Sequence, residues 1–100
     1  MLIRLHVVIT SSKDEDRNLI KKELLRIHPS FSISPFIDDR FISGYSECYV
    51  TCQLSQNQLQ HLLDQLNDDW DEDEGDYTSY SFNTKMFHPL VYSLHLQVFE

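Results

Sequence analysis

The stretch Met1-Leu2-Ile3-Arg4-Leu5-His6-Val7-Val8-Ile9 alternates between apolar and polar side chains over most of its length. Because successive side chains of a β-strand point to opposite faces, the alternation predicts a half-buried strand over residues 2–9. Arg4 and His6 would lie on the face that turns away from the core. The opposite, apolar face would carry Ile3, Leu5, Val7 and Ile9.

Two later segments are typical of helices that cover such an apolar face. Ser12 with Glu15, and Ser55 with Gln58, have the spacing of a capping box at a helix start. His28-Pro29 would end the first helix. The apolar stripes of the two helices would be Leu19, Ile20, Leu24 and Ile27, and then Leu59, Leu62, Leu63 and Leu66.

Further strands are predicted between and after the helices. Phe31 and Ile33 alternate with serines, and Pro35 marks this strand as an edge strand or a bulge. Ser43-Gly44 fits a hairpin turn better than Asp38-Asp39 does, and a third strand is predicted after it, over residues 48–54. Alternation over residues 77–84 predicts a fourth strand, and residues 90–98 a fifth.

The resulting order is β-α-β-β-α-β with one more strand at the end. It predicts a single α+β domain over residues 1–100, with a ferredoxin-like antiparallel sheet and both helices on one face. The extra C-terminal strand would add to the sheet edge beside the fourth strand. Alternatively, residues 77–84 are a short excursion and residues 90–99 are the true fourth strand.

Charge is unevenly distributed along the chain. Residues 1–40 carry a net charge of +1, whereas residues 41–100 carry only Lys85 against ten carboxylates, a net charge of −9. A half with this charge repels DNA, RNA and anionic membranes, so we expect a basic protein partner and no direct contact with nucleic acid or membrane. Without a basic leader or a long apolar run, the chain is expected to be cytoplasmic.

The acidic residues concentrate in the run Asp68-Asp69-Trp70-Asp71-Glu72-Asp73-Glu74-Gly75-Asp76. Such a run repels itself, and we expect a solvated loop or a surface for a cationic partner. It does not fit an EF-hand, because a loop that starts at Asp69 has Glu74 where glycine is needed and Tyr80 where glutamate is needed. Interleaved aromatic side chains favour protein binding, since rings supply contact area and charges supply steering.

No pattern in the chain predicts catalysis, a metal site or a cofactor. The histidines lack metal-ligand spacing, although His6 and His95 could meet on one sheet face, and two glycines cannot build a phosphate loop. Cys48 and Cys52 would lie about 13 Å apart on one strand, too far for a disulfide, and are expected to be buried thiols. The first helix has a row of cationic side chains, which predicts a face exposed to solvent. The spacing does not decide whether this face also contacts the acidic run. The residues are Arg17, Lys21, Lys22 and Arg26.

In size, charge and predicted architecture, the chain resembles the immunity proteins of bacterial contact-dependent inhibition and polymorphic toxin systems. The resemblance implies an inhibitor that covers the cationic substrate cleft of a nuclease toxin. It assigns steering to Asp68, Asp69, Asp71, Glu72, Asp73, Glu74 and Asp76, and anchoring to Trp70, Tyr77 and Tyr80.

Two other functions fit the same residues. One is a nucleic-acid-mimicking inhibitor or regulator of another nuclease, which would use the same acidic surface. The other is a ferredoxin-like regulatory module that binds a small ligand at a dimer interface, although so few glycines leave no obvious backbone cradle.

Overall fold

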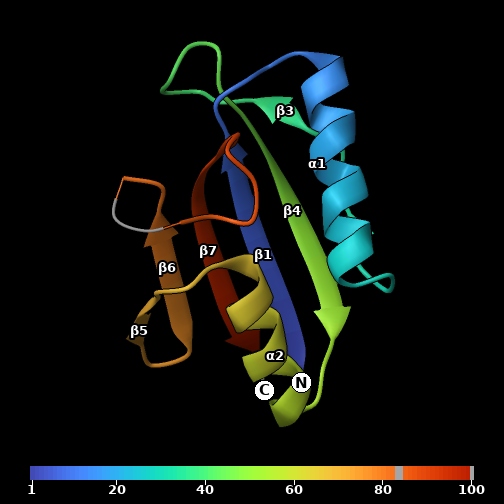
Figure 1. The fold of residues 1–100 in the computed structure, drawn as a ribbon, viewed down its shortest axis with the longest axis vertical. Helices are drawn as coiled ribbons and strands as arrows, with labels where there is room; N and C mark the ends of the chain where they lie inside the picture. The colour runs from blue at the N-terminus through green and yellow to red at the C-terminus, as the bar shows by residue number, and fades with distance from the viewer. Residues whose placement is uncertain (83–84, 100) are drawn as a thin grey trace.

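The strand Leu2–Ile9 (β1) lies inside an antiparallel sheet of an α+β fold in the computed structural model, which describes residues 1–82 and 85–99 (Figure 1). Within these residues the fold has two helices and seven strands, in the sheet order β2-β4-β1-β7-β6-β5, with β3 also paired to β4. The other elements are α1 (Asp14–Ile27), β2 (Ser32–Ile33), β3 (Ile37–Asp38), β4 (Ser46–Gln53), α2 (Gln56–Leu66), β5 (Asp71–Asp73), β6 (Asp76–Tyr80) and β7 (Val91–Phe99).

The apolar phase of β1 forms the centre of the core, as the alternation predicted. The side chains of Ile3, Leu5, Val7 and Ile9 are fully buried. β4 and β7 pair with β1 on either side, and their apolar side chains point to the same face of the sheet. Both helices cover that face with buried residues, and among the described residues no helix lies over the second face of the sheet.

The two helix starts differ from each other in their caps. At α2 the capping box is confirmed: the Ser55 hydroxyl accepts from the Gln58 N–H, and the Gln58 side chain accepts from the Ser55 N–H. At α1 the predicted Ser12–Glu15 box is wrong, because the N-cap position is Lys13 and has no side-chain cap. Ser11 takes part there instead, accepting from the Lys13 N–H and donating to Asp16.

The predicted apolar stripe of α1 is also only partly buried. Ile20 and Leu24 are fully buried and Ile27 packs against the core, but Leu19 is 41% exposed. Pro35 interrupts the second strand as expected, and the two short pieces β2 and β3 both pair with β4. No helix in the described part of the chain is long and apolar enough to cross a membrane.

The last strand does not lie at the edge of the sheet. β7 pairs with β1 on one side and with β6 on the other. The last strand therefore lies beside the strand predicted over 77–84, but its predicted place at the sheet edge is wrong. The alternative is also only partly right, because β6 is a paired strand of the sheet and not a short excursion. The strand predicted over 77–84 is β6, which ends at Tyr80; residues 83–84 of that prediction lie outside the described residues. The β5–β6 hairpin between α2 and β7 makes the strand order differ from the ferredoxin order.

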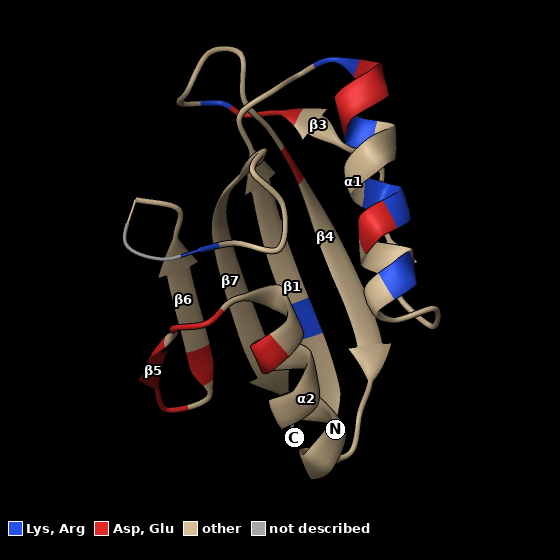
Figure 2. Ribbon diagram, viewed as in Figure 1, with Lys and Arg blue, Asp and Glu red and all other residues tan. Residues whose placement is uncertain are grey.

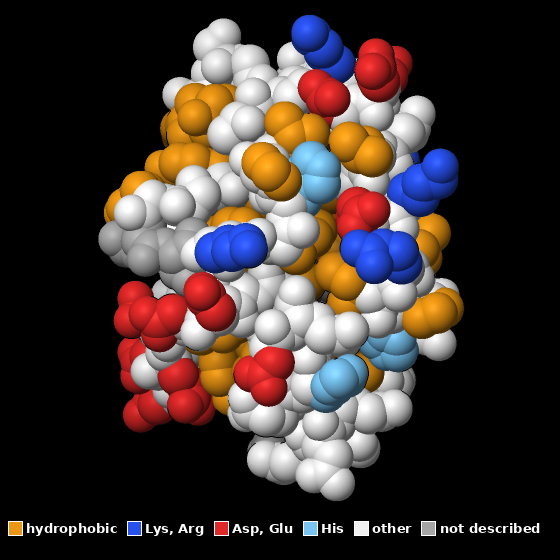
Figure 3. All heavy atoms as spheres, in the orientation of Figure 1, with side chains coloured by type: hydrophobic (Ala, Val, Ile, Leu, Met, Phe, Trp, Pro, Cys, Tyr) orange, Lys and Arg blue, Asp and Glu red, His pale blue; other side chains and the backbone are white. Residues whose placement is uncertain are grey.

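From Asp71 onward the acidic run is a β-hairpin and not a loop, and only its first three residues lie outside a strand or turn. Asp71–Asp73 pairs with Asp76–Tyr80 around a two-residue turn in which Glu74 and Gly75 both have positive φ, +49° and +86°. Two successive positive φ angles are typical of the type I′ turn that suits the twist of a hairpin. The Asn67 amide holds the base of the hairpin by donating to the Asp69 carbonyl and the Ser79 hydroxyl. Figures 2 and 3 show the carboxylates gathered at this edge of the sheet.

Replacing Gly75 with alanine should destabilise the protein by about 1–2 kcal/mol, because an L-residue adopts a left-handed conformation only at that cost. The cost is conformational, since a Cβ at position 75 would meet only the Val98 carbonyl at an ordinary 4.0 Å. Urea unfolding of Gly75→Ala measures it. Glu74→Asn is the matched control and should stabilise the protein, because asparagine tolerates positive φ better than glutamate does. Equal stability of all three proteins would contradict the turn.

Candidate functional site

The helix-free face of the sheet, called here the open face, brings together polar and aromatic side chains from five strands. Strand register places them in three rows that run across the sheet. The rows are Thr51, Arg4, Gln97, Asp76 and Asp73; then Tyr49, His6, His95, Thr78 and Asp71; and then Glu47, Val8, Ser93 and Tyr80.

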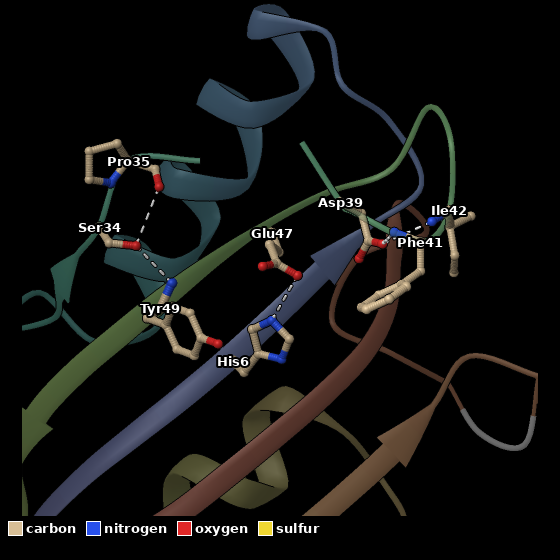
Figure 4. Close-up of polar contacts among 8 residues, drawn as sticks. All are labelled: His6, Ser34, Pro35, Asp39, Phe41, Ile42, Glu47 and Tyr49. Carbon is tan, nitrogen blue, oxygen red and sulfur yellow. Dashed lines mark hydrogen bonds and ion pairs between the residues drawn. The ribbon is translucent and has the colours of Figure 1, made fainter. Parts of the chain in front are cut away.

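The ring of His6 makes two contacts, both with residues of β4 (Figure 4). Its Nε2 lies 3.3 Å from Glu47 Oε2, and its ring stacks on Tyr49 with centroids 4.7 Å apart. The Arg4 guanidinium lies over the same tyrosine, 5.4 Å from the ring centroid, and donates to the Gln97 side chain. Packed in this way, the centre of the open face presents stacked rings beside the guanidinium of Arg4.

His95 lies directly opposite His6 in the β1–β7 register, as the sequence predicted for these two residues. Its Nε2 is 3.3 Å from Asp76 Oδ1, so each imidazole has its own carboxylate partner. The four groups follow one another across the face and do not converge on one point. Among the described residues, no group of three or more histidine, cysteine or acidic side chains is arranged to hold a metal ion.

A row of four aromatic rings borders this polar centre; we call Tyr45, Tyr92, Tyr80 and Phe82 the aromatic row. Neighbouring ring centroids are 5.3, 6.2 and 5.3 Å apart, in edge-to-face and then stacked contacts. Tyr80 is 41% exposed and Phe82 70% exposed. The row therefore offers partly exposed aromatic area of the kind that anchors protein interfaces.

Sequence reasoning missed Tyr92 because its strand contains a bulge. If the strand alternated strictly, the side chain of Tyr92 would point into the core together with those of Leu94 and Leu96. The β1–β7 register shifts between Val8 and Ile9, so Val91 takes the core position and Tyr92 packs against Tyr45 and Tyr80. Pairing between distant strands sets this shift, and no local signal marks it.

The predicted acidic site residues divide between the two faces of the sheet. Asp71, Asp73 and Asp76 share the open face with His95, because each pairs with an open-face residue. Glu72 pairs with Tyr77 on the helix side, and Glu74 occupies the turn. Asp68 and Asp69 are exposed and precede the hairpin. All seven carboxylates are exposed, but only three of them share the open face by register.

The predicted aromatic anchors divide in the same way. Trp70 is partly buried against the core, and its Nε1–H donates to the Leu63 carbonyl at 2.9 Å. Tyr77 meets it edge to face at 6.4 Å, also against the core. Only Tyr80 of the three lies on the open face. We therefore expect Trp70 and Tyr77 to hold the hairpin on the domain and Tyr80 to remain available for contact.

The basic side chains of α1 do not contact the acidic hairpin. Arg17 pairs with Asp38 at 2.5 Å, Arg26 pairs with Glu23 on its own helix, and Lys21 lies over the Phe36 ring. Figure 2 shows α1 and β5 at opposite sides of the molecule. The internal contact considered from the sequence is therefore absent from the described residues.

The two cysteines are free and buried, as predicted. Burial raises the pKa of the Cys48 thiol to about 12 and that of the Cys52 thiol to about 11. Because the thiolate is the reactive form, neither side chain is activated for nucleophilic chemistry.

Asp39 shapes the loop beside the open face (Figure 4). Its carboxylate accepts from the backbone N–H groups of Phe41 and Ile42 at 2.8 and 2.9 Å, and these bonds lower its pKa below the usual 3.8. Since the folded-state pKa is depressed, the stabilisation is fully present above pH 3.8 and is lost as the pH falls through the folded value.

Titration of the Asp39 carboxyl by carbon-detected NMR should accordingly give a midpoint below 3.8 in the folded protein. The same carboxyl in the urea-unfolded chain supplies the reference. A folded midpoint at or above that reference would show that the Asp39 carboxylate does not accept these backbone hydrogen bonds.

No protein-family model, curated protein or solved structure matches the chain.

Proposed function

We propose that this protein is an inhibitor of the immunity type, which binds a basic nuclease toxin domain and covers its cationic substrate cleft. The observation that carries the proposal is the placement of Asp71, Asp73 and Asp76 on the same open face as the aromatic row. Carboxylates and partly exposed rings on one helix-free face combine long-range attraction with contact area.

In this proposal the acidic hairpin guides the partner to the open face. The hairpin forms one edge of the sheet, with β5 outermost, and its carboxylates are exposed to solvent there. An excess of negative charge accelerates encounter with a cationic protein, and salt weakens the effect. The hairpin would set the association rate.

The aromatic row would set the dissociation rate. Tyr80 and Phe82 expose ring area, while Tyr45 and Tyr92 support them from the side. Rings that are already packed lose little conformational freedom on binding, which favours a long-lived complex. The proposal thus moves the anchor role from Trp70 and Tyr77 to the aromatic row.

The proposal includes no catalysis and no cofactor, and it locates the protein in the cytoplasm, where a nuclease toxin meets its substrate. It also treats the fold as ferredoxin-like with an inserted hairpin, since β1, β4, β7, the β2–β3 edge and the two helices follow that arrangement and only β5 and β6 depart from it.

A tagged pull-down from the native host at low and then high salt tests the function. We expect a stoichiometric basic polypeptide that dissociates at roughly 0.5 M salt, where screening extends to a few ångströms. The purified polypeptide should cleave nucleic acid, and addition of this protein should stop the cleavage. Absence of such a polypeptide at low salt, or cleavage that continues at saturating protein, would overturn the proposal.

A further inference from the structure

The loop between β3 and β4 carries the most exposed large apolar side chain among the described residues. Phe41 is 89% exposed, while Ile37 in β3 and Ile42 in the loop are 54% and 37% exposed. A single exposed ring is ordinary on a protein surface. Several exposed apolar side chains in one short segment are less common, and such a surface is typical of a site that contacts another protein.

Hydrogen bonds hold residues 39–45, called here the Phe41 loop, in one shape (Figure 4). The Asp39 carboxylate accepts from the N–H groups of Phe41 and Ile42. The backbone closes the loop further, because the Asp39 N–H donates to the Tyr45 carbonyl at 2.9 Å and the Tyr45 N–H donates to the Ile42 carbonyl at 3.2 Å. A side chain on such a loop is already in position, so it loses little conformational freedom when a partner binds.

The Phe41 loop continues the open face at its β4 side. Tyr45, the last residue of the loop, is the first ring of the aromatic row and meets Tyr92 at 5.3 Å. Ile37 pairs with Glu47 in the β3–β4 register, and paired residues of neighbouring strands point to the same face. Because Glu47 lies on the open face, Ile37 lies there too. The exposed apolar side chains are therefore an extension of the surface that holds the aromatic row.

Arg40 places a cation beside the exposed ring. Its guanidinium carbon lies 5.9 Å from the centroid of the Phe41 ring. The neighbouring carboxylates are engaged elsewhere, since Asp38 pairs with Arg17 and Asp39 accepts from the backbone N–H groups. Among the residues that the structure describes, Arg40 has no ion-pair partner. A guanidinium beside an exposed ring is complementary to an apolar surface that has a carboxylate next to it.

We propose that Phe41 inserts into an apolar pocket of the protein partner, and that a carboxylate at the rim of this pocket pairs with Arg40. The inference rests on the proposed function in one respect, that a protein docks on the open face, and it does not require that protein to be a nuclease. The acidic hairpin and the Phe41 loop lie on opposite sides of the sheet order, beyond β6 and beyond β4. They would contact surfaces of opposite charge, which fixes the orientation of the partner.

Photo-crosslinking tests the contact directly. With p-benzoylphenylalanine in place of Phe41, irradiation in a lysate of the native host should form an adduct with the polypeptide that the wild type captures. Mass spectrometry should place the link among apolar side chains of that polypeptide, with an aspartate or glutamate near them. The matched control has the same photoreactive residue in place of Leu25, which is 42% exposed on α1, and should form no such adduct.

Dissociation rates with the captured polypeptide measure the size of each contribution. Phe41→Ala should raise the dissociation rate by about tenfold or more, as for other interface anchors. Its unfolding midpoint should stay at the wild-type value, because so exposed a ring contributes little to packing. Arg40→Gln should raise the rate by roughly twofold to fivefold, the scale of an exposed ion pair. Leu25→Ala should dissociate as the wild type does.

The outcomes separate this inference from the proposed function. The Phe41 contact is overturned if no polypeptide crosslinks at position 41, if the adduct joins two copies of this protein, or if Phe41→Ala dissociates at the wild-type rate. A polypeptide that depends on Phe41 for slow dissociation but does not cleave nucleic acid would support the contact and overturn the inhibition of a nuclease.

Discussion

Replacing Trp70 with alanine should lower the free energy of unfolding by about 3 kcal/mol, the scale of losing a large aromatic side chain from a packed site. The indole is partly buried against the core, meets Tyr77 edge to face and donates to the Leu63 carbonyl at the end of α2. The core contact and the hydrogen bond to Leu63 connect the hairpin to the helix side of the domain, and the Tyr77 contact holds the indole against the hairpin itself. Urea unfolding followed by circular dichroism measures the loss.

Two further variants separate packing from surface effects. Trp70→Phe keeps much of the apolar contact but lacks the Nε1–H, so it should lose an intermediate amount. Tyr80→Ala removes a ring that is 41% exposed, and its effect on unfolding should be much smaller. If Trp70→Ala unfolds at the same urea concentration as the wild type, the indole is not part of the core.

Neutralising Asp71, Asp73 and Asp76 together as asparagines should slow association with the basic partner by more than tenfold at low ionic strength. These carboxylates lie on the open face, where they act together on an approaching cation. The dissociation rate should change less, because steering acts before contact. Surface plasmon resonance with the captured partner, at two salt concentrations, resolves both rates.

The matched control neutralises three carboxylates on the helices, Asp14→Asn, Glu15→Gln and Asp64→Asn. It changes the net charge by the same amount but leaves the open face intact. Only the hairpin variant should associate slowly, and the difference between the two should shrink as salt is added. Equal slowing would mean that total charge, and not its position, governs encounter.

Local patterns were sufficient to predict much of the fold. Strict alternation in β1 and the Ser55–Gln58 capping box each act within a few residues, and both are confirmed. The position of β7 could not be read in that way, because either placement of the last strand satisfies the same alternation. Contact with β1, which is more than 80 residues away in sequence, decides between them.

The candidate site was predictable in its charge but not in its shape. The acidic run was evident, yet aspartate disfavours strands, and only pairing with Tyr77 and Thr78 makes β5. Gly75 was the available signal for a turn between two strands. The aromatic row combines rings from separate segments through a bulge, so it appears only when the sheet is assembled.

The insertion of β7 between β1 and β6 also sets an order of events during synthesis. The ribosome makes the acidic hairpin before β7, but within the described sheet the hairpin joins β1 and β4 only through β7. Until residues 91–99 emerge, the nascent chain has an unfilled central position in the sheet, and one edge of β1 has no strand to pair with. Completion of the fold, and with it the open face, therefore waits until residues 91–99 are available for pairing, and a partly folded chain is open to chaperones before then.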